Sequence, residues 1–276
     1  MPARPDRTGN NGGVDDPDDI EIRSPSGRLS ARVSPRRGGR LAALRFDGLP
    51  VIVEGTGNDD PLAWGCYPMV PYCGRVRDAV LRVDDRTCTL PRNAPPHAIH
   101  GTVHDSVWTI ARTTDASVTL NTDLGATWPF RGHVEHLLTL TDHSLHMQLT
   151  LRAEDEMPWM IGWHPWFVKP DQSPVDVGPM FRRDEYGIAT AELVERPAGP
   201  VDDCFVAREA ILTMRVGSLS VALSSDCECW VIYDEPAHAT CVEPQSGPPN
   251  QVNDDPRRAS RGSMVGRWFR IDLAVV

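Results

Sequence analysis

The feature that most constrains the fold is a period-two alternation of apolar and polar residues along most of the chain. It is clearest in Val134 to Leu140, Leu145 to Leu151 and Phe269 to Val275. Successive side chains of a strand point to opposite faces, so this period indicates half-buried β-strands. The same alternation returns in shorter runs, which are Leu29 to Val33, Leu41 to Phe46, Val51 to Val53, Trp108 to Ile110, Ser117 to Thr122, Leu212 to Val216, Leu219 to Leu223 and Cys229 to Tyr233.

Proline and glycine interrupt the chain too often for long helices. There are 25 prolines and 22 glycines, and turn signals such as PRRGGR and the DG pair before Val51 separate successive runs. Only Ala189 to Glu195 leans toward helix, and Gly187 and Pro197 confine it. Many short strands without intervening helices predict an all-β protein, a sandwich or barrel of mostly antiparallel strands.

The composition divides the chain into a tail and one body. Residues 1–18 are rich in proline, glycine, asparagine and aspartate, and with so little apolar content they cannot offset the entropy of ordering. We expect a disordered tail there. After residue 20 no composition shift marks a linker and no fixed-period repeat appears, which favours a single β-sandwich domain over residues 19–276.

Charge and cysteine content exclude several classes of partner. A net charge of -10 and a pI near 5.3 argue against nucleic acid and anionic membrane surfaces. No run is long enough to span a membrane, and the amino terminus lacks the apolar stretch of a secretory signal. Seven cysteines, an odd number spread along the chain, indicate reduced thiols in a cytoplasm more than a disulfide framework.

Two groups of residues could suggest a metal site. The three histidines of HAIHGTVH, residues 97–104, have a spacing that gathers ligands only on a helix, which the preceding prolines and Gly101 oppose. Cys227, Cys229 and Cys241 lack paired C-x-x-C spacing and fit small buried hydrophobic residues better. The sequence therefore predicts no metal, and it shows no phosphate cradle, nucleophile elbow or dinucleotide fingerprint.

Polar and aromatic residues gather in five segments between the predicted strands, more densely than turns require. They are Tyr67 to Arg77, Pro95 to Trp108, Gly162 to Phe167, Val201 to Phe205 and Cys241 to Asn253. Loops on a rigid sheet commonly carry functional sites, so we expect the site in these five.

His164 stands in the almost wholly apolar run MPWMIGWHPWFV, residues 157–168. It lies between Gly162 and Pro165, where we expect the backbone to turn, with aromatic neighbours to shield it from water. Such a setting tunes proton chemistry. The alternative is a core histidine with a satisfied hydrogen bond.

Glu243 follows an apolar strand end and precedes a proline-rich loop. Partial desolvation there would raise its proton affinity toward useful basicity, and a salt-bridged edge glutamate is the alternative. Arg75 has a permanent positive charge and a planar set of N–H donors that could bind a ligand. The alternative is a structural ion pair. Asp202 and Asp203 point in opposite directions if extended, so only one is expected to face a given pocket.

Together these residues include groups that can donate and accept protons and polar groups that can bind a ligand. Trp64, Trp163 and Trp166 could supply the flat apolar faces on which sugar C–H surfaces rest. This set of residues favours acid–base work on a small polyhydroxylated ligand. A glycoside hydrolase would instead need two carboxylates facing each other across the bond.

In five motifs the chain resembles the aldose 1-epimerase (galactose mutarotase) family. They are PYCGRV near residue 75, HAIHG at 97–101, GWHPWF at 162–167, VDDCF at 201–205 and CVEPQSGPPN at 241–250, in the family's order. The resemblance spans nearly the whole chain after the tail. It implies a galactose mutarotase-like β-supersandwich with an open sugar cleft and no cofactor. The implied partner is a small-molecule sugar, and the protein would be a monomer or homodimer.

The resemblance also implies roles for single residues. His164 would be the general acid and Glu243 the general base that interconvert the α and β anomers of a free aldose. The sugar-binding positions would be Arg75, His100, Asp202 rather than Asp203, and Trp166.

The chain departs from the family at Gly74, where asparagine is usual, and at Trp166, where tyrosine is usual. These departures bear on substrate preference more than on chemistry. A sister group that epimerises hexose 6-phosphates carries H-G-F-A-R, whereas this chain has HGTVH, which favours an unphosphorylated sugar. The remaining alternatives are a hexose-6-phosphate 1-epimerase and a carbohydrate-binding or regulatory protein without turnover.

Overall fold

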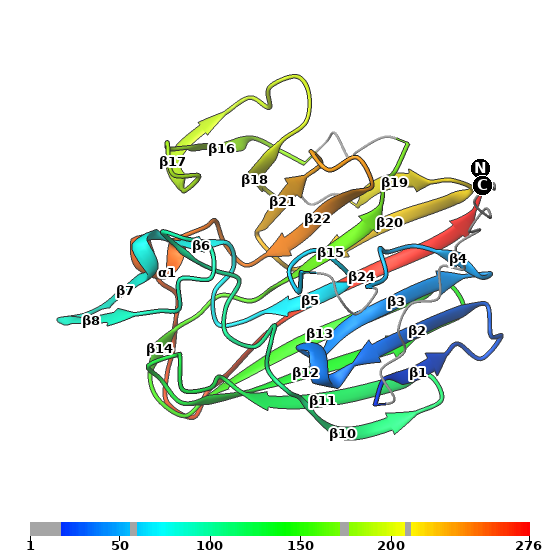
Figure 1. Ribbon diagram of the computed structural model, residues 1–276, viewed down its shortest axis with the longest axis horizontal. Helices are drawn as coiled ribbons and strands as arrows, with labels where there is room; N and C mark the ends of the chain where they lie inside the picture. The colour runs from blue at the N-terminus through cyan, green and yellow to red at the C-terminus, as the bar shows by residue number, and fades with distance from the viewer. Residues whose placement is uncertain (1–17, 56–59, 172–176, 208–210) are drawn as a thin grey trace, which may run out of the picture.

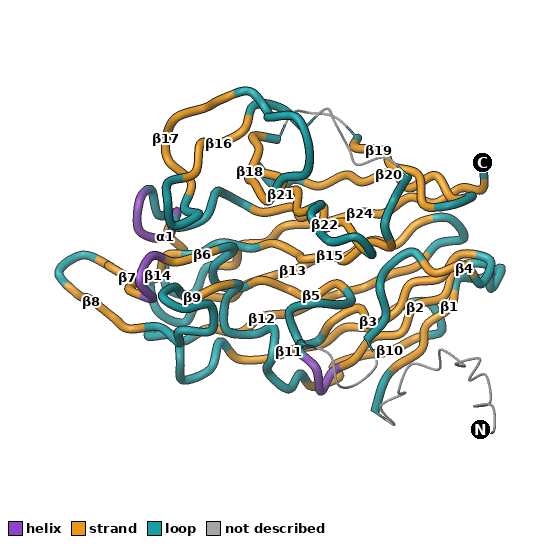
Figure 2. The backbone as a smooth tube through the Cα atoms, turned by 45° about the horizontal axis from the view of Figure 1, so that its top comes forward, coloured by secondary structure: helices purple, strands orange, loops and turns teal. Residues whose placement is uncertain are grey.

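The structure is a computed structural model that describes residues 18–55, 60–171, 177–207 and 211–276. Within this part the chain forms two large antiparallel sheets that pack face to face (Figure 1). Strands dominate, and the helices are short turns (Figure 2). The prediction of an all-β protein of mostly antiparallel strands is confirmed. The predicted tail lies outside the described residues, apart from Asp18, which forms an ion pair with Arg36.

The larger sheet has eleven strands and the smaller has seven. The larger runs in the order β1 (Ile20–Arg23), β2 (Leu29–Ser34), β3 (Arg40–Phe46), β5 (Cys66–Met69), β15 (Gly162–Val168), β22 (Ala239–Gln245), β21 (Cys229–Tyr233), β18 (Asp202–Val206), β16 (Met180–Arg183) and β17 (Ala189–Val194), with β4 (Leu49–Pro50) beside β3. The smaller runs in the order β10 (Thr109–Thr114), β11 (Ser117–Asp123), β12 (Gly132–Leu140), β13 (Ser144–Ala153), β24 (Met264–Val275), β20 (Leu219–Ser225) and β19 (Leu212–Val216).

Three two-stranded ladders and three short helical turns complete the described part of the chain. The ladders pair β6 (Arg75–Val76) with β9 (Ala98–Ile99), β7 (Val80–Val83) with β8 (Arg86–Thr89), and β14 (Met157–Pro158) with β23 (Arg258–Ala259). The helical turns are η1 (Pro35–Arg37), η2 (Arg77–Ala79) and α1 (Gln251–Asp254). No helix among the described residues is long and apolar enough to cross a membrane.

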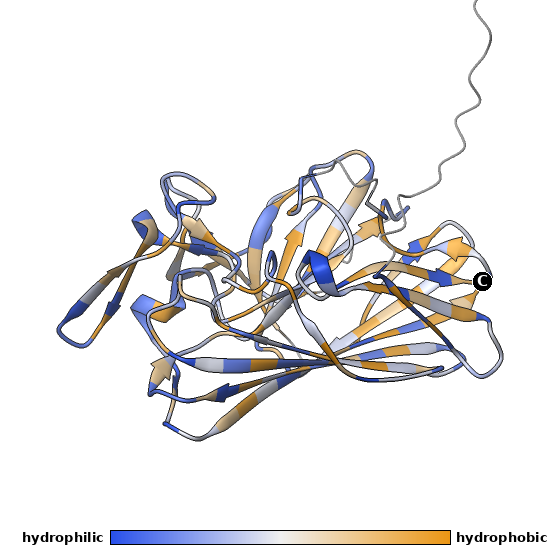
Figure 3. Cartoon of the chain, turned by 60° about the horizontal axis from the view of Figure 1, so that its bottom comes forward, coloured by the Kyte–Doolittle hydropathy of each residue, from blue (hydrophilic) through white to orange (hydrophobic). Residues whose placement is uncertain are grey.

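Where the period-two alternation holds, a strand has one buried and one more exposed face, whereas β5 and β22 are buried on both faces and β10 is exposed throughout. Along β12, for example, Val134 and Leu138 are buried, whereas Glu135 between them is exposed. Figure 3 shows the resulting bands of hydrophobic and hydrophilic residues along the strands. The predicted DG turn is also confirmed, because Asp47 and Gly48 both have positive φ, as a two-residue hairpin turn requires.

Several local predictions are wrong. Ala189 to Glu195 is no helix, because the segment pairs with β16 as the strand β17. The run Val51 to Val53 is not a strand, and only Ile52 makes an isolated bridge, to Phe167.

Two of the five predicted loops lie largely on strands, namely β15 and β18, and the first part of a third lies on β22. The expected turn at His164 is therefore wrong. A residue before proline is driven to extended backbone, so the sequence His164–Pro165 continues β15 where it was expected to turn. The strand lies between β5 and β22, in the middle of the larger sheet.

Trp163 on β15 faces the interior between the two sheets. Its ring centroid lies 6.0 Å from that of Phe269 on β24. Its indole N–H donates to Nε2 of His136 at 3.2 Å, and Nδ1–H of His136 donates to the Gly39 carbonyl at 3.1 Å. Trp163 thus ties the sheets together, and alternation turns the next residue, His164, to the opposite face.

We expect His136 to make the fold acid-sensitive. Burial lowers the pKa of His136 to about 4, and protonation would turn Nε2 from an acceptor into a second donor facing the indole N–H. The unfolded chain takes up the proton near pH 6.5, so stability falls as the pH drops from there toward 4. Between pH 7 and pH 5 this single group should cost roughly 2 kcal/mol.

The measurement is urea unfolding at both pH values for the wild type, His136→Gln and the control His146→Gln. The His136 variant should start less stable and lose less on acidification than the other two proteins. An equal loss in all three would contradict the assignment.

Candidate active site

The strand register of β15 and β22 places two titratable side chains opposite each other. Trp166 pairs with Cys241 in the antiparallel ladder. His164 lies two residues before Trp166 on β15, and Glu243 lies two residues after Cys241 on β22. In the same register, His164 and Glu243 are therefore opposite each other. Side chains two residues apart share a face of the sheet, and directly opposed side chains lie close together.

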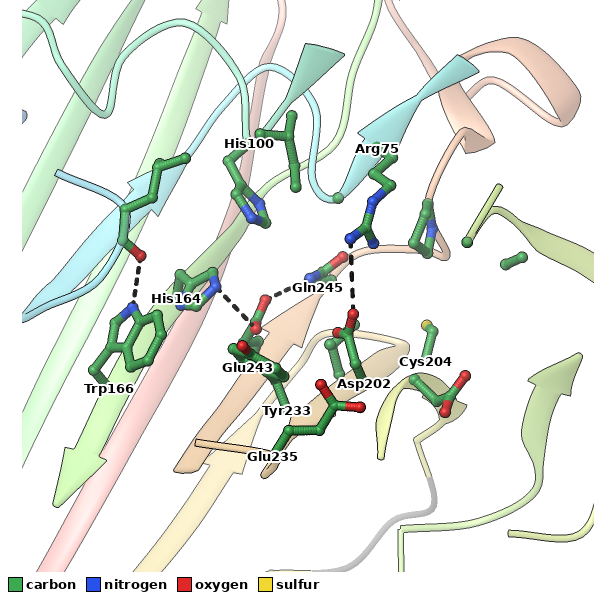
Figure 4. A pocket seen from close by; sticks show the side chains of 18 of the residues that line it. Arg75, His100, His164, Trp166, Asp202, Cys204, Tyr233, Glu235, Glu243 and Gln245 are labelled. Atoms are coloured by element: carbon green, nitrogen blue, oxygen red, sulfur yellow. Dashed lines mark hydrogen bonds and ion pairs between the residues drawn. The ribbon is translucent and has the colours of Figure 1, made fainter. Parts of the chain in front are cut away.

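His164 and Glu243 are in direct contact. Nε2 of His164 lies 3.1 Å from Oε1 of Glu243, and the two residues are only 5% and 2% exposed. The side-chain amide of Gln245 donates to Oε2 of Glu243 at 2.9 Å. Figure 4 shows the imidazole and the carboxylate pointing toward each other, with Gln245 on the far side of the carboxylate.

Burial sets the charge state of this pair. It lowers the pKa of His164 and raises the pKa of Glu243, which the negative charge of Asp202 raises further. Both shifts favour uncharged groups, because a low-dielectric site disfavours charge. These directions favour a pair that shares one exchangeable proton, with that proton on Glu243.

Aromatic rings hold the imidazole in place. Tyr67 on β5 is stacked on His164 with ring centroids 4.8 Å apart, and Trp166 is stacked on it at 5.5 Å. The indole N–H of Trp166 donates to the Leu62 carbonyl at 2.9 Å, which fixes that ring. His100 approaches the imidazole edge-on at 4.9 Å.

The pair lies against a cavity of about 420 Å³, a size typical of small-molecule sites. All of the site residues expected from the sequence line it, namely Arg75, His100, His164, Trp166, Asp202 and Glu243. The structure thus brings together residues from β6, β15, β18 and β22 and from the turn after β9. Their individual roles remain predictions.

Both adjacent aspartates line the cavity, so the expectation that only one would face it is wrong. Arg75 lies 3.7 Å from Asp202. Arg183, from β16, contacts Asp202 at 3.2 Å and Asp203 at 2.6 Å. A shared guanidinium draws the two carboxylates together, although alternation along β18 turns them apart.

A strained turn positions His100. Its φ is +62°, and Gly101 follows at +80°. Left-handed backbone at a non-glycine residue persists only where the surroundings enforce it, and such residues cluster at functional sites. Here the amide of His100 donates to the Gly74 carbonyl at 3.1 Å, which ties the turn to the segment before Arg75.

Two of the three tryptophans expected to face a sugar do not line the cavity. Trp163 lies in the core, and Trp64 packs against the buried guanidinium of Arg40, 4.2 Å from its ring. Only Trp166 lines the cavity. His97 has a structural contact, since its Nδ1 accepts from the Asp78 amide at 3.0 Å.

Sequence reasoning assigned no role to several cavity residues, namely Tyr67, Arg183, Tyr233, Glu235 and Gln245. Gln245 could have been found, because it stands two residues beyond Glu243 and so shares its face. Tyr67 pairs in register with His164, but that pairing joins segments nearly a hundred residues apart. Arg183 has no local signal.

A group of metal-ligating atoms exists, in neither of the places weighed from the sequence. Among the described residues, one nitrogen of His164, the sulfur of Cys241 and a carboxylate oxygen of Glu243 lie within 4.8 Å of one another. Of its three members, only Cys241 belonged to a group that was weighed as a metal site from the sequence.

Other proteins share this fold. A galactose 1-epimerase from Lactobacillus acidophilus aligns with TM-score 0.79 and 13% identity over 93% of this chain and 94% of its own. An aldose epimerase homologue from C. elegans aligns with TM-score 0.80 and 15% identity, over 94% and 99%. A galactose mutarotase-like protein from Clostridium acetobutylicum aligns with TM-score 0.77 and 17% identity, over 91% and 94%. No curated protein matches the sequence closely enough to count as a relative.

The two facing sheets are thus those of a galactose mutarotase-like β-supersandwich, as the resemblance implied. The sequence itself matches the family model for aldose 1-epimerase over residues 18–266. The chain belongs to the aldose 1-epimerase family.

We expect Gly101→Ala to distort the turn that holds His100. The added methyl group would lie 2.2 Å from the Val70 carbonyl oxygen, in addition to the strain at φ +80°. Positive φ alone costs about 1–2 kcal/mol, and overpacking adds about 1–3 kcal/mol. Gly125→Ala is the matched control, because Gly125 has φ +78° with no atom within 4 Å of the new methyl group. Thermal unfolding should show the larger loss for Gly101→Ala, and equal losses would contradict the close contact.

Proposed function

We propose that the protein is an aldose 1-epimerase, a mutarotase that interconverts the α and β anomers of a free aldose. The observation that supports this most is the contact of 3.1 Å between His164 and Glu243 in the wall of the cavity. The pair holds one exchangeable proton and one group that can accept another. Exchange between anomers needs one proton donated to the sugar and one proton accepted from it. Membership of the aldose 1-epimerase family supports the same class of reaction.

In the reaction, the shared proton first moves from Glu243 to Nε2 of His164. His164 then gives it to the ring oxygen, while Glu243 takes the proton of the anomeric hydroxyl. The bond between the anomeric carbon and the ring oxygen breaks, and a carbonyl forms at that carbon. Rotation about the adjacent carbon–carbon bond presents the other face, and ring closure reverses both transfers. The steps balance without oxidant, reductant or cofactor.

Arg75, His100 and Asp202 would hold the sugar hydroxyls in register, with Trp166 against an apolar face of the ring. The contact between Arg75 and Asp202 supports this role, because it offers neighbouring donors and acceptors before a sugar arrives. Groups held in place beforehand lower the entropy cost of reaching the reactive geometry.

We place the protein in the cytoplasm. All seven cysteines are free, and six of them are buried. Free thiols persist in a reducing compartment.

We expect His164→Gln and Glu243→Gln to slow mutarotation. Each removes one proton carrier, which contributes on the order of a hundredfold to ten-thousandfold. Polarimetry on freshly dissolved α-glucose and α-galactose measures the rate, with His146→Gln as a control histidine on β13 and circular dichroism as the test of folding. Sugar binding without acceleration by the wild type would identify a carbohydrate-binding protein instead. Near wild-type rates in both site variants would refute the assigned roles.

We expect a free hexose to be preferred over its 6-phosphate. Besides Glu243, the cavity lining carries more carboxylates than guanidinium groups, namely Asp60, Asp202, Asp203 and Glu235 against Arg75 and Arg183. A phosphate dianion would therefore meet net repulsion. The value of kcat/KM should be at least about tenfold lower for the phosphorylated sugar, and added salt should narrow the gap. A preference for the phosphate would assign the protein to the sister activity.

A further inference from the structure

We propose that His164 and Glu243 in the wall of the cavity, together with the buried Cys241 beside them, also form a site for a soft divalent cation of the zinc class, which excludes the sugar and inhibits the enzyme. The inhibition rests on the function proposed above. The binding of the cation does not, and it can be tested separately.

The two central strands supply the geometry. Cys241 and Glu243 are two residues apart on β22 and so share one face. Cys241 pairs in register with Trp166, two residues beyond His164 on β15. The three ligand atoms accordingly lie within 4.8 Å of one another.

The donor set fits zinc. Imidazole nitrogen, thiolate sulfur and carboxylate oxygen are the three ligand types that zinc takes in proteins. With Zn–N and Zn–O of about 2.0 Å and Zn–S of about 2.3 Å, the three ligand atoms of a tetrahedral site lie roughly 3.3–3.5 Å apart. The nitrogen and oxygen atoms are already 3.1 Å apart, so the main adjustment falls on the sulfur atom of Cys241. The fourth position would face the cavity, which His164 and Glu243 line.

The surroundings hold two of the ligands in place. Gln245 donates to the Glu243 oxygen that does not face His164, and Tyr67 stacks on the imidazole. Such outer contacts orient metal ligands and raise affinity. Cys241 is fully buried on the same strand. The sheet thus holds His164 and Glu243 at ligand distance from each other, and Cys241 has to make a small shift toward them.

Binding requires deprotonated ligands, so protons must leave as the cation enters. Zinc would displace the thiol proton of Cys241 and the single proton that His164 and Glu243 share, and both pass to solvent. The metal-bound pair then has neither a proton to give nor a free carboxylate to accept one. Because the cation would occupy the two cavity residues that exchange protons with the sugar, cation and sugar would compete for the site.

Cys204 provides a matched control. It lies on β18, lines the same cavity and is buried, but it is not part of the ligand group. If zinc were captured by any thiol near the sugar, Cys204→Ser would weaken binding as much as Cys241→Ser.

The experiment uses Zn²⁺ and Co²⁺ as probes on the full chain, with no sugar present. Calorimetry with Zn²⁺ should show one site in the wild type and in Cys204→Ser, weakened at least about tenfold in Cys241→Ser. Co²⁺ should give a thiolate-to-metal absorption band in the near ultraviolet, present in the wild type and absent in Cys241→Ser. No such band in the wild type, its survival in Cys241→Ser, or its loss in Cys204→Ser would overturn the site.

A second arm adds Zn²⁺ to the mutarotation assay, with each variant compared with its own metal-free rate. Competitive inhibition that is relieved in Cys241→Ser supports the proposal. Binding of Co²⁺ through Cys241 without inhibition would overturn the inhibitory role and leave the cation site standing. A wild type without mutarotase activity would refute the proposed function alone.

Discussion

The antiparallel register of β15 and β22 is the constraint on which the rest of the site depends. It fixes His164 opposite Glu243 by main-chain hydrogen bonds on neighbouring strands, so no flexible segment has to bring the pair together. Side chains on regular elements are held more tightly than side chains on loops. The loops and outer strands then add Arg75, His100 and Asp202 around a pair that is already in place.

The same two strands explain how a histidine and a carboxylate are kept out of water. Both strands are buried on each face through most of their length, because one face packs on the second sheet and the other forms the wall of the cavity. Burying two charges would be costly, whereas one proton shared between them leaves an uncharged pair. Gln245 satisfies the remaining carboxylate oxygen.

Much of this architecture could be predicted from the sequence, because the period of two is a local property. Alternation predicted most strands and the all-β class, and the chemistry of single residues made His164 and Glu243 candidates for the site. The sequence could not show that His164–Pro165 continues a strand, because proline is also common in turns. Nor could it reveal Tyr67 or Arg183, whose positions depend on pairings between distant segments.

The alternation along β15 limits the insertions and deletions that the protein can accept. Trp163 belongs to the core and His164 to the cavity, and they are separated by a single step along the strand. A one-residue insertion or deletion before this point would exchange their faces, sending the imidazole inward and the indole outward. Length changes in this family member should therefore be tolerated at hairpin tips such as the one between β7 and β8, which projects from the sheets in Figure 1, and eliminated within β15.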